Sequence, residues 1–258
     1  MIKNIIGILR TAGCVFAEEE AQLLISEART LDDLSKMVNT RITGMPLEHV
    51  LGWAEFCGMR IAVDPGVFVP RRRTEFLVQK AVSLSAPGAI VVDLCCGTGA
   101  VGVAIAKALG WIELYAVDID PTAVSCAHRN VTTLGGLVYE GDLYQPLPAK
   151  LRGKVDILVA NAPYVPTEAI QLLPQDARLH EPMAALDGGN DGLDIQRRVA
   201  EEASQWLAPG GHLIIETSKM QAPQTVEIFA QYGLIPQLTH NDELDATIVI
   251  GSKPAPFE

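Results

Sequence analysis

The sequence predicts an α/β protein in which a doubly wound, mostly parallel β-sheet follows a small helical segment and a linking β-hairpin. Two patterns lead to this fold class. Apolar runs at residues 89–94, 113–118 and 155–160 alternate with helical segments, as in parallel sheets that helices cover on both faces. The residues before position 46 show only the helical spacing of apolar side chains.

The helical segment is predicted to span residues 1–46. Residues 17–24 are rich in good helix formers, and residues 31–42 repeat apolar side chains at helical spacing until Gly44 and Pro46 end the pattern. Because short helices depend on packing for their stability, we expect them to pack on another part of the protein.

A β-hairpin is expected next, within a linker of residues 47–74. Residues 60–63 and 67–69 are short extended runs, and Asp64-Pro65-Gly66 between them is a turn signal. We therefore expect these two runs to pair with each other and the sheet domain to follow over residues 75–258.

The remaining elements of the sheet domain follow in the same rhythm. The run 89–94 leads into a glycine-rich turn and a helix, and Pro121 begins a second helix at its first turn, where a missing N–H is tolerated. Two further strands are predicted at residues 212–216, after the turn Pro209-Gly210-Gly211, and at residues 246–250.

The composition is that of a globular protein with an acidic surface. The 258 residues include 31 acidic and 20 basic side chains, for a net charge of −11, and 48% hydrophobic residues. No uncharged apolar run reaches the roughly 20 residues that cross a membrane, and no signal-peptide cleavage pattern follows the first residues. We therefore expect a cytoplasmic protein without membrane contact.

Charge and ligand-type residues also bear on partners and metals. A net negative surface is repelled by phosphate backbones, and the cluster Arg71-Arg72-Arg73 is too small to form a nucleic-acid channel. Direct nucleic-acid binding is therefore not expected. Five cysteines, an odd number, and five histidines without ligand spacing indicate buried free thiols and no metal site.

A glycine-rich loop follows the first strand of the sheet domain. Gly97, Gly99 and Gly102 fit the pattern G-x-G-x-x-G, and Asp118 ends the next strand about 20 residues later. This pattern is typical of NAD-binding folds, in which a pyrophosphate rests on a helix N-terminus. A tight strand-to-helix turn without any ligand would use the same glycines.

Carboxylates at successive strand ends favour S-adenosylmethionine over NAD. Asp93 introduces the loop, Asp118 ends the next strand, and Asp142 follows a third predicted strand. Asp93 suits the ammonium of the methionyl end and would repel a pyrophosphate. Asp118 can accept from the ribose hydroxyls, and Asp142 from the adenine amino group, although each carboxylate alone could be a helix cap or a surface group.

The motif Asn161-Ala162-Pro163-Tyr164 carries the expected chemistry. It ends the strand at 155–160, so it faces the same crevice as the glycine loop. The lone pair of a planar amide or aryl amine is delocalised, and acceptors on both of its N–H groups, the Asn161 side-chain oxygen and the Ala162 carbonyl, would localise it. Tyr164 would lie flat against the planar group. Taken alone, the motif could also be a plain strand-ending turn.

Together these motifs resemble a known family. D-L-C-C-G-T-G, V-D-I-D-P, G-D-L-Y and N-A-P-Y, in this order and spacing, resemble class I S-adenosylmethionine-dependent methyltransferases that act on planar nitrogen. The segments at residues 46–52, 66–75 and 181–189 are similar to signatures of the release-factor glutamine methyltransferases, the HemK family. The similarity runs from about residue 12 to residue 250.

The resemblance implies a seven-stranded methyltransferase sheet, S-adenosylmethionine as cofactor with S-adenosylhomocysteine as product, and a protein substrate. In the family, the N-x-P-Y loop holds the glutamine amide of a Gly-Gly-Gln loop in a peptide-chain release factor. The catalytic residues that it implies are Asn161, Ala162, Pro163 and Tyr164. The expected cofactor-binding residues are Phe68, Asp93, Cys95, Cys96, Gly97, Thr98, Gly99, Asp118, Asp142, Leu143 and Asn161.

The chain departs from the family's pattern at four places. Ala162 replaces a proline of N-P-P-Y, and Arg72 replaces a proline of P-R-P-x-T-E. The helical segment is shorter than the family's. A glycine is missing within residues 216–219, and the arginine expected near Asp245 is absent.

Three other functions are compatible with parts of the sequence. N-x-P-Y serves an exocyclic base amine of DNA or RNA, or another small amide or amine, equally well, although the net charge argues against nucleic acid. The glycine pattern alone allows an NAD-dependent oxidoreductase. The altered motifs allow a protein-binding module without catalysis.

Overall fold

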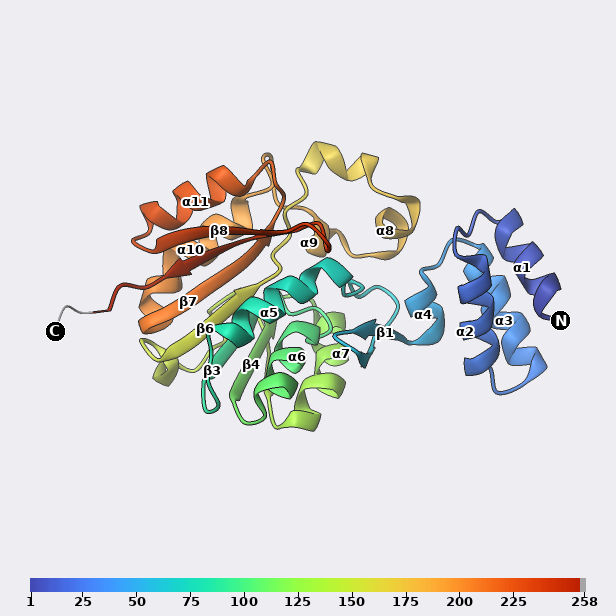
Figure 1. Ribbon diagram of the computed structural model, residues 1–258, viewed down its shortest axis with the longest axis horizontal. Coiled ribbons are helices and arrows are strands. Elements are labelled where there is room, and N and C mark those ends of the chain that lie inside the picture. The colour runs from blue at the N-terminus through green and yellow to red at the C-terminus, as the bar shows by residue number, and fades with distance from the viewer. Residues whose placement is uncertain (256–258) are drawn as a thin grey trace.

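One large β-sheet forms the centre of the protein and confirms the predicted α/β fold class. Its strands are β3 (Ile90–Leu94), β4 (Glu113–Asp118), β5 (Leu137–Glu140), β6 (Val155–Ala160), β7 (Leu207–Thr217), β8 (Ile235–Asn241) and β9 (Ala246–Ser252). The structure, a computed structural model, describes residues 1–255. Within them seven strands form this sheet, in the order β5-β4-β3-β6-β7-β9-β8 (Figure 1). The five strands from β5 to β7 run parallel, and β9 pairs antiparallel with both β7 and β8.

Helices cover both faces of the sheet, so the doubly wound arrangement is confirmed as well. One face packs against α5 (Glu75–Ser83), α6 (Ala100–Leu109) and α7 (Pro121–Val131), and the other against α10 (Asp194–Trp206) and α11 (Ala222–Gln231). Val91 and Val92 of β3 belong to the two different cores, because successive strand residues point to opposite faces. The winding reverses between β3 and β6, and such a switch point leaves a crevice outside the carboxyl ends of the strands.

The N-terminal helices form a separate small core. They are α1 (Ile2–Thr11), α2 (Ala17–Glu27) and α3 (Leu31–Ile42), followed by the short α4 (Leu47–Leu51). Leu9 and Leu24 are completely buried between them. Figure 1 shows this group at one end of the molecule, away from the sheet. The expectation that these helices would pack on another part of the protein is therefore corrected, because three amphipathic helices suffice to bury their apolar faces against one another.

The β-hairpin lies earlier in the chain than predicted. Its strands are β1 (Trp53–Phe56) and β2 (Met59–Ala62), which pair antiparallel around a turn at Cys57-Gly58. The predicted pairing of residues 60–63 with residues 67–69 is wrong. Val67 is buried against Ala123 and Cys126 of α7, so its apolar character reflects packing and not strand pairing.

Two details near the C-terminal end also differ from the predictions. Pro209-Gly210-Gly211 lies inside β7 and not before it. At this part of β7 the pairing with β6 shifts register, between Val155 and Ile157. The largely exposed edge strand β8 was not predicted, because its burial does not alternate. Two short helices, α8 (Gln175–His180) and α9 (Met183–Leu186), follow β6. Among residues 1–255, no helix is both long enough and apolar enough to cross a membrane.

Asn130 of α7 ties the hairpin to the glycine loop. Its Oδ1 accepts from the Ala62 N–H at 3.0 Å, and its Nδ2 donates to the carbonyls of Ala62 at 3.0 Å and of Thr98 at 2.9 Å. One side chain thus connects the end of β2, the glycine loop before α6 and the body of α7.

Replacing Asn130 with alanine should lower the free energy of unfolding by about 1–3 kcal/mol, because partly buried backbone groups of Ala62 and Thr98 lose their partners. Urea unfolding measures the loss. The control is Thr133→Ala, which removes an exposed hydrogen bond to the Asn130 carbonyl and should change the same quantity by less than about 0.5 kcal/mol. Equal effects of the two substitutions would contradict the role assigned to Asn130.

Candidate functional site

A cavity of about 950 Å³ opens at the carboxyl ends of β3, β4, β6 and β7 and brings most of the predicted site residues together. Those that line it are Phe68, Asp93, Cys95, Cys96, Gly97, Thr98, Asp118, Asp142, Leu143, Asn161, Ala162, Pro163 and Tyr164. The exception is Gly99, which does not line the cavity. Residues from the α8–α9 segment complete the opposite wall.

The three glycines of the loop serve three different purposes. Gly97 has a φ of +55° and lines the cavity. Gly99 has a φ of +75°, and a Cβ there would lie 2.5 Å from Val131 of α7, so its place in the pattern reflects helix packing. A Cβ on Gly102 would lie 2.8 Å from Leu114 and 3.2 Å from Asp93, and its absence lets α6 approach the sheet.

Backbone N–H groups orient two of the strand-end carboxylates. Asp93 is 1% exposed, and its Oδ2 accepts from the Gly102 N–H at 2.9 Å. Asp118 accepts from Gly97 N–H through Oδ2 at 2.8 Å and from Asp120 N–H through Oδ1 at 3.0 Å. Burial raises the pKa of Asp93 to about 7 and also raises the pKa of Asp118. Neither carboxylate has a cationic side chain as a hydrogen-bond partner within residues 1–255.

The third carboxylate and the adjacent thiols have different surroundings. Asp142 pairs with Arg198 of α10 through its Oδ2 at 2.6 Å, and both residues line the cavity. Burial raises the pKa of the Cys95 and Cys96 thiols, so both remain protonated and act as apolar parts of the wall.

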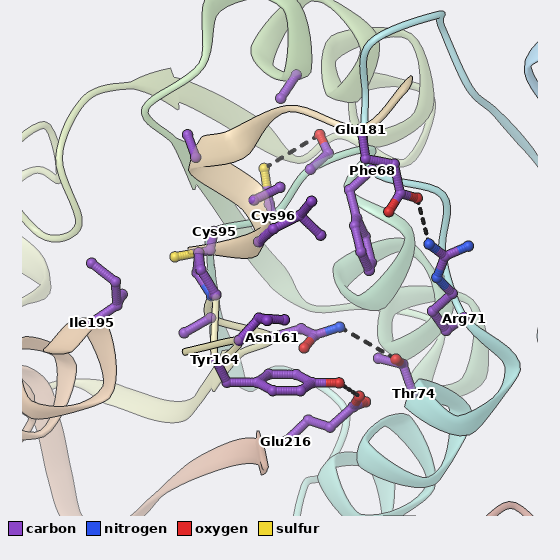
Figure 2. A pocket seen from close by; sticks show the side chains of 18 of the residues that line it. Phe68, Arg71, Thr74, Cys95, Cys96, Asn161, Tyr164, Glu181, Ile195 and Glu216 are labelled. Atoms are coloured by element: carbon purple, nitrogen blue, oxygen red, sulfur yellow. Dashed lines mark hydrogen bonds and ion pairs between the residues drawn. The ribbon is translucent and has the colours of Figure 1, made fainter. Parts of the chain in front are cut away.

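The loop after β6 places an amide and an aromatic ring in the same cavity. The Nδ2 of Asn161 donates to Oγ1 of the buried Thr74 at 3.3 Å (Figure 2). This hydrogen bond uses the nitrogen of the amide and leaves its oxygen as the acceptor available to a ligand. The neighbouring Ala162 is 1% exposed and lines the cavity.

Tyr164 is held by an ion pair that was not foreseen. Its hydroxyl donates to Glu216 Oε1 at 3.4 Å and accepts from Arg73, whose Nε donates to the same Glu216 oxygen at 3.0 Å. Figure 2 shows the tyrosine ring beside Asn161 with its hydroxyl at Glu216. Burial and the charge of Glu216 raise the pKa of Tyr164 to about 12, so the phenol stays neutral.

Two residues of the basic cluster, Arg71 and Arg73, line the cavity, and Arg72 does not. Arg71 pairs with the buried Glu181 at 2.5 Å and lies over the ring of Phe68, and Arg73 pairs with the buried Glu216. The residues missed in the sequence are Thr74, Glu181, Arg198, Glu216 and the two arginines in these roles. Glu216 could have been found, because it ends the apolar run at 212–216 as Asp118 ends its own strand. The pairings themselves join segments far apart in sequence.

Comparison with known proteins agrees with this geometry. Residues 58–189 match the family described as Methyltransferase small domain. The release factor glutamine methyltransferase of Geobacter sulfurreducens is 34% identical, over 96% of this chain and 93% of that protein. The enzyme of the same name from Gloeobacter violaceus is 39% identical, over 74% of this chain and 69% of that protein.

A solved structure agrees on the fold. A methyltransferase from Pyrococcus furiosus superposes with a TM-score of 0.59 at 16% identity, over 76% of this chain and 90% of that one. With the sequence relatives, the sheet order and the motif loops at one edge, the assignment follows: the chain belongs to the family of release factor glutamine methyltransferases.

Proposed function

We propose that this protein transfers the methyl group of S-adenosylmethionine to the side-chain amide nitrogen of a protein glutamine, in the Gly-Gly-Gln loop of a peptide-chain release factor. The observation that carries the proposal is the sharing of one cavity by the glycine loop after β3 and the N-A-P-Y loop after β6. The names of the sequence relatives support the choice of substrate.

The residues of the cavity fit this cofactor. Neither Asp93 nor Asp118 pairs with an arginine or lysine of residues 1–255, so their ionised forms suit a cationic ligand and disfavour the pyrophosphate of NAD. Asp93 would hold the α-ammonium group, Asp118 the ribose hydroxyls and Asp142 the adenine amino group, under the ring of Phe68. When bound, the cofactor supplies an electrophilic methyl group on its sulfonium, and S-adenosylhomocysteine is the product.

The N-A-P-Y loop would then orient the substrate amide. The Asn161 side-chain oxygen and the Ala162 carbonyl accept from the two N–H groups, so the nitrogen lone pair is directed out of the amide plane. The Thr74 hydroxyl fixes which end of the Asn161 side chain faces the cavity. The ring of Tyr164 supports the plane of the amide. This chemistry needs positioning and electrostatics and no strong general base.

The charges of the cavity argue against nucleic acid as the substrate. The cations that line it are Arg71, Arg73, Arg198 and Lys219. Each is paired with a carboxylate, of Glu181, Glu216, Asp142 or Asp245 respectively. Within residues 1–255 no unpaired cation lines the cavity to bind a phosphate backbone, whereas an uncharged peptide meets no such requirement.

The affinity for S-adenosylmethionine should depend on pH through Asp93. Burial raises the pKa of this group to about 7, so it is protonated below that pH and ionised above it. Because only the ionised form pairs with an ammonium, affinity should rise up to about tenfold per pH unit below pH 7. It should fall again above about pH 8, where an α-amino group loses its proton. Calorimetry at a series of pH values measures this affinity, and Asp93→Asn should abolish its rise with pH. A variant that kept the rise would contradict the role of Asp93.

Asn161→Ala should lower kcat for methylation of a release factor by about 100-fold and weaken the binding of S-adenosylmethionine much less, because Asn161 is only one of the eleven residues expected to bind it. Mass spectrometry of the release factor, incubated with enzyme and labelled cofactor, measures the rate and the modified residue. Asn161→Asp, which keeps an acceptor oxygen, is the matched variant and should lose less activity. Methylation of DNA or RNA by the wild-type enzyme, with none of the release factor, would overturn the proposed substrate.

A further inference from the structure

The ends of the strands form an ordered row of polar side chains along the edge of the sheet. The sheet order β5-β4-β3-β6-β7 gives the row Asp142, Asp118, Asp93, Asn161 and Glu216, and all five line the cavity. The first three are the carboxylates assigned above to the cofactor. Glu216 lies beyond Asn161 in this row, on the side away from the three carboxylates.

Only one of the two Glu216 oxygens has a hydrogen-bond partner. Oε1 accepts from Arg73 and Tyr164, whereas Oε2 is buried and accepts from no group within residues 1–255. We call Oε2 the open oxygen. A carboxylate oxygen that is removed from water without a donor is costly, and Glu216 is only 1% exposed. Glu181 Oε2 lacks a donor on the same cavity wall, but only Glu216 also contacts Tyr164 of the N-A-P-Y loop among residues 1–255. Its place beside that loop therefore points to a donor that a ligand brings.

The surroundings of the open oxygen define the chemistry of that donor. Arg73 already compensates the charge of Glu216, and the nearby Asp245 is paired with Lys219. The pairs leave no net charge to attract a cationic ligand. The donor that fits is an uncharged N–H, and an amide N–H of a peptide main chain is the commonest such group.

We infer that Glu216 is a substrate-binding residue whose open oxygen accepts a hydrogen bond from a main-chain N–H of the peptide beside the methylated glutamine. The inference rests on the proposed function. The two N–H groups of the glutamine side chain are bound by Asn161 and Ala162 in that function, so they do not serve Glu216. The glycines that precede the glutamine have no side chains, so the donors that they offer are main-chain N–H groups.

Arg73 and Tyr164 are positioning residues in this arrangement. Both contact the other oxygen of Glu216, so they fix the direction in which the open oxygen points. The same contact anchors the hydroxyl of Tyr164. The carboxylate of Glu216 thereby links the substrate, at one oxygen, to the N-A-P-Y loop, at the other.

The test uses Gly-Gly-Gln peptides in which each main-chain N–H is replaced in turn by an ester oxygen, which cannot donate. Wild-type enzyme should lose about tenfold in kcat/KM at one position, the loss expected for about 1.4 kcal/mol. Glu216→Ala should raise KM for the parent peptide and show no further loss with that ester. Glu20→Ala removes a buried carboxylate outside the cavity that pairs with Arg41 through both oxygens, and it should still discriminate between ester and parent peptide.

Several controls make the result decisive. Calorimetric binding of S-adenosylmethionine and thermal unfolding test whether the Glu216→Ala enzyme is folded. If that variant is unfolded, Glu216→Gln, which keeps the shape of the side chain, takes its place in the experiment. Equal rates of wild-type enzyme on every ester peptide, or a Glu216→Ala enzyme that still discriminates, would overturn the inference. Failure of the proposed function looks different: the wild-type enzyme would bind the cofactor and leave the parent peptide unmethylated, which overturns both.

Discussion

The meeting of the glycine loop with the N-A-P-Y loop depends on the parallel pairing of β3 with β6. The two strands are distant in sequence but pair directly, from Val91 with Ile157 to Leu94 with Ala160. The winding of the sheet reverses between them, so no crossover helix of this sheet closes the space beyond their ends. The glycine loop and the N-A-P-Y loop therefore open into one cavity. A shift of register by one residue would turn Asp93 to the other face of the sheet and separate the two halves of the site.

The row of strand-end groups divides into two electrostatic environments. Backbone N–H groups orient Asp93 and Asp118, so no cationic side chain of residues 1–255 competes with a bound cofactor for these two carboxylates. Arginines neutralise Glu181 and Glu216, so these two carboxylates add no net charge to the part proposed for the substrate. A cationic methyl donor is favoured by carboxylates without a cationic partner, and an uncharged amide by carboxylates that are neutralised. The protein provides both kinds, because backbone N–H groups bind the first set and arginines bind the second.

The departures from the family's pattern look less severe in three dimensions. The arginine expected near Asp245 is absent, but Arg73 brings a positive charge to the same part of the cavity, where Lys219 chiefly and Arg73 more weakly lower the pKa of Asp245. The segment that contains Arg71, Arg73 and Thr74 thereby contacts Glu181, Glu216 and Asn161. Three parts of the cavity wall are thus joined through four consecutive residues.

The sequence by itself determined the alternation of strands and helices, the glycine loop, Asp93, Asp118 and the N-A-P-Y motif, because these depend on local periodicity and on residues adjacent to a strand end. Tertiary structure alone decided which apolar runs pair as a hairpin, and packing of Val67 against α7 overrode its strand-like pattern. Only the folded chain brings Arg73 to Glu216 and Tyr164, or shows that Gly99 packs on Val131 and does not line the cavity. Such contacts join residues from different strands and loops. No periodicity along one segment encodes them.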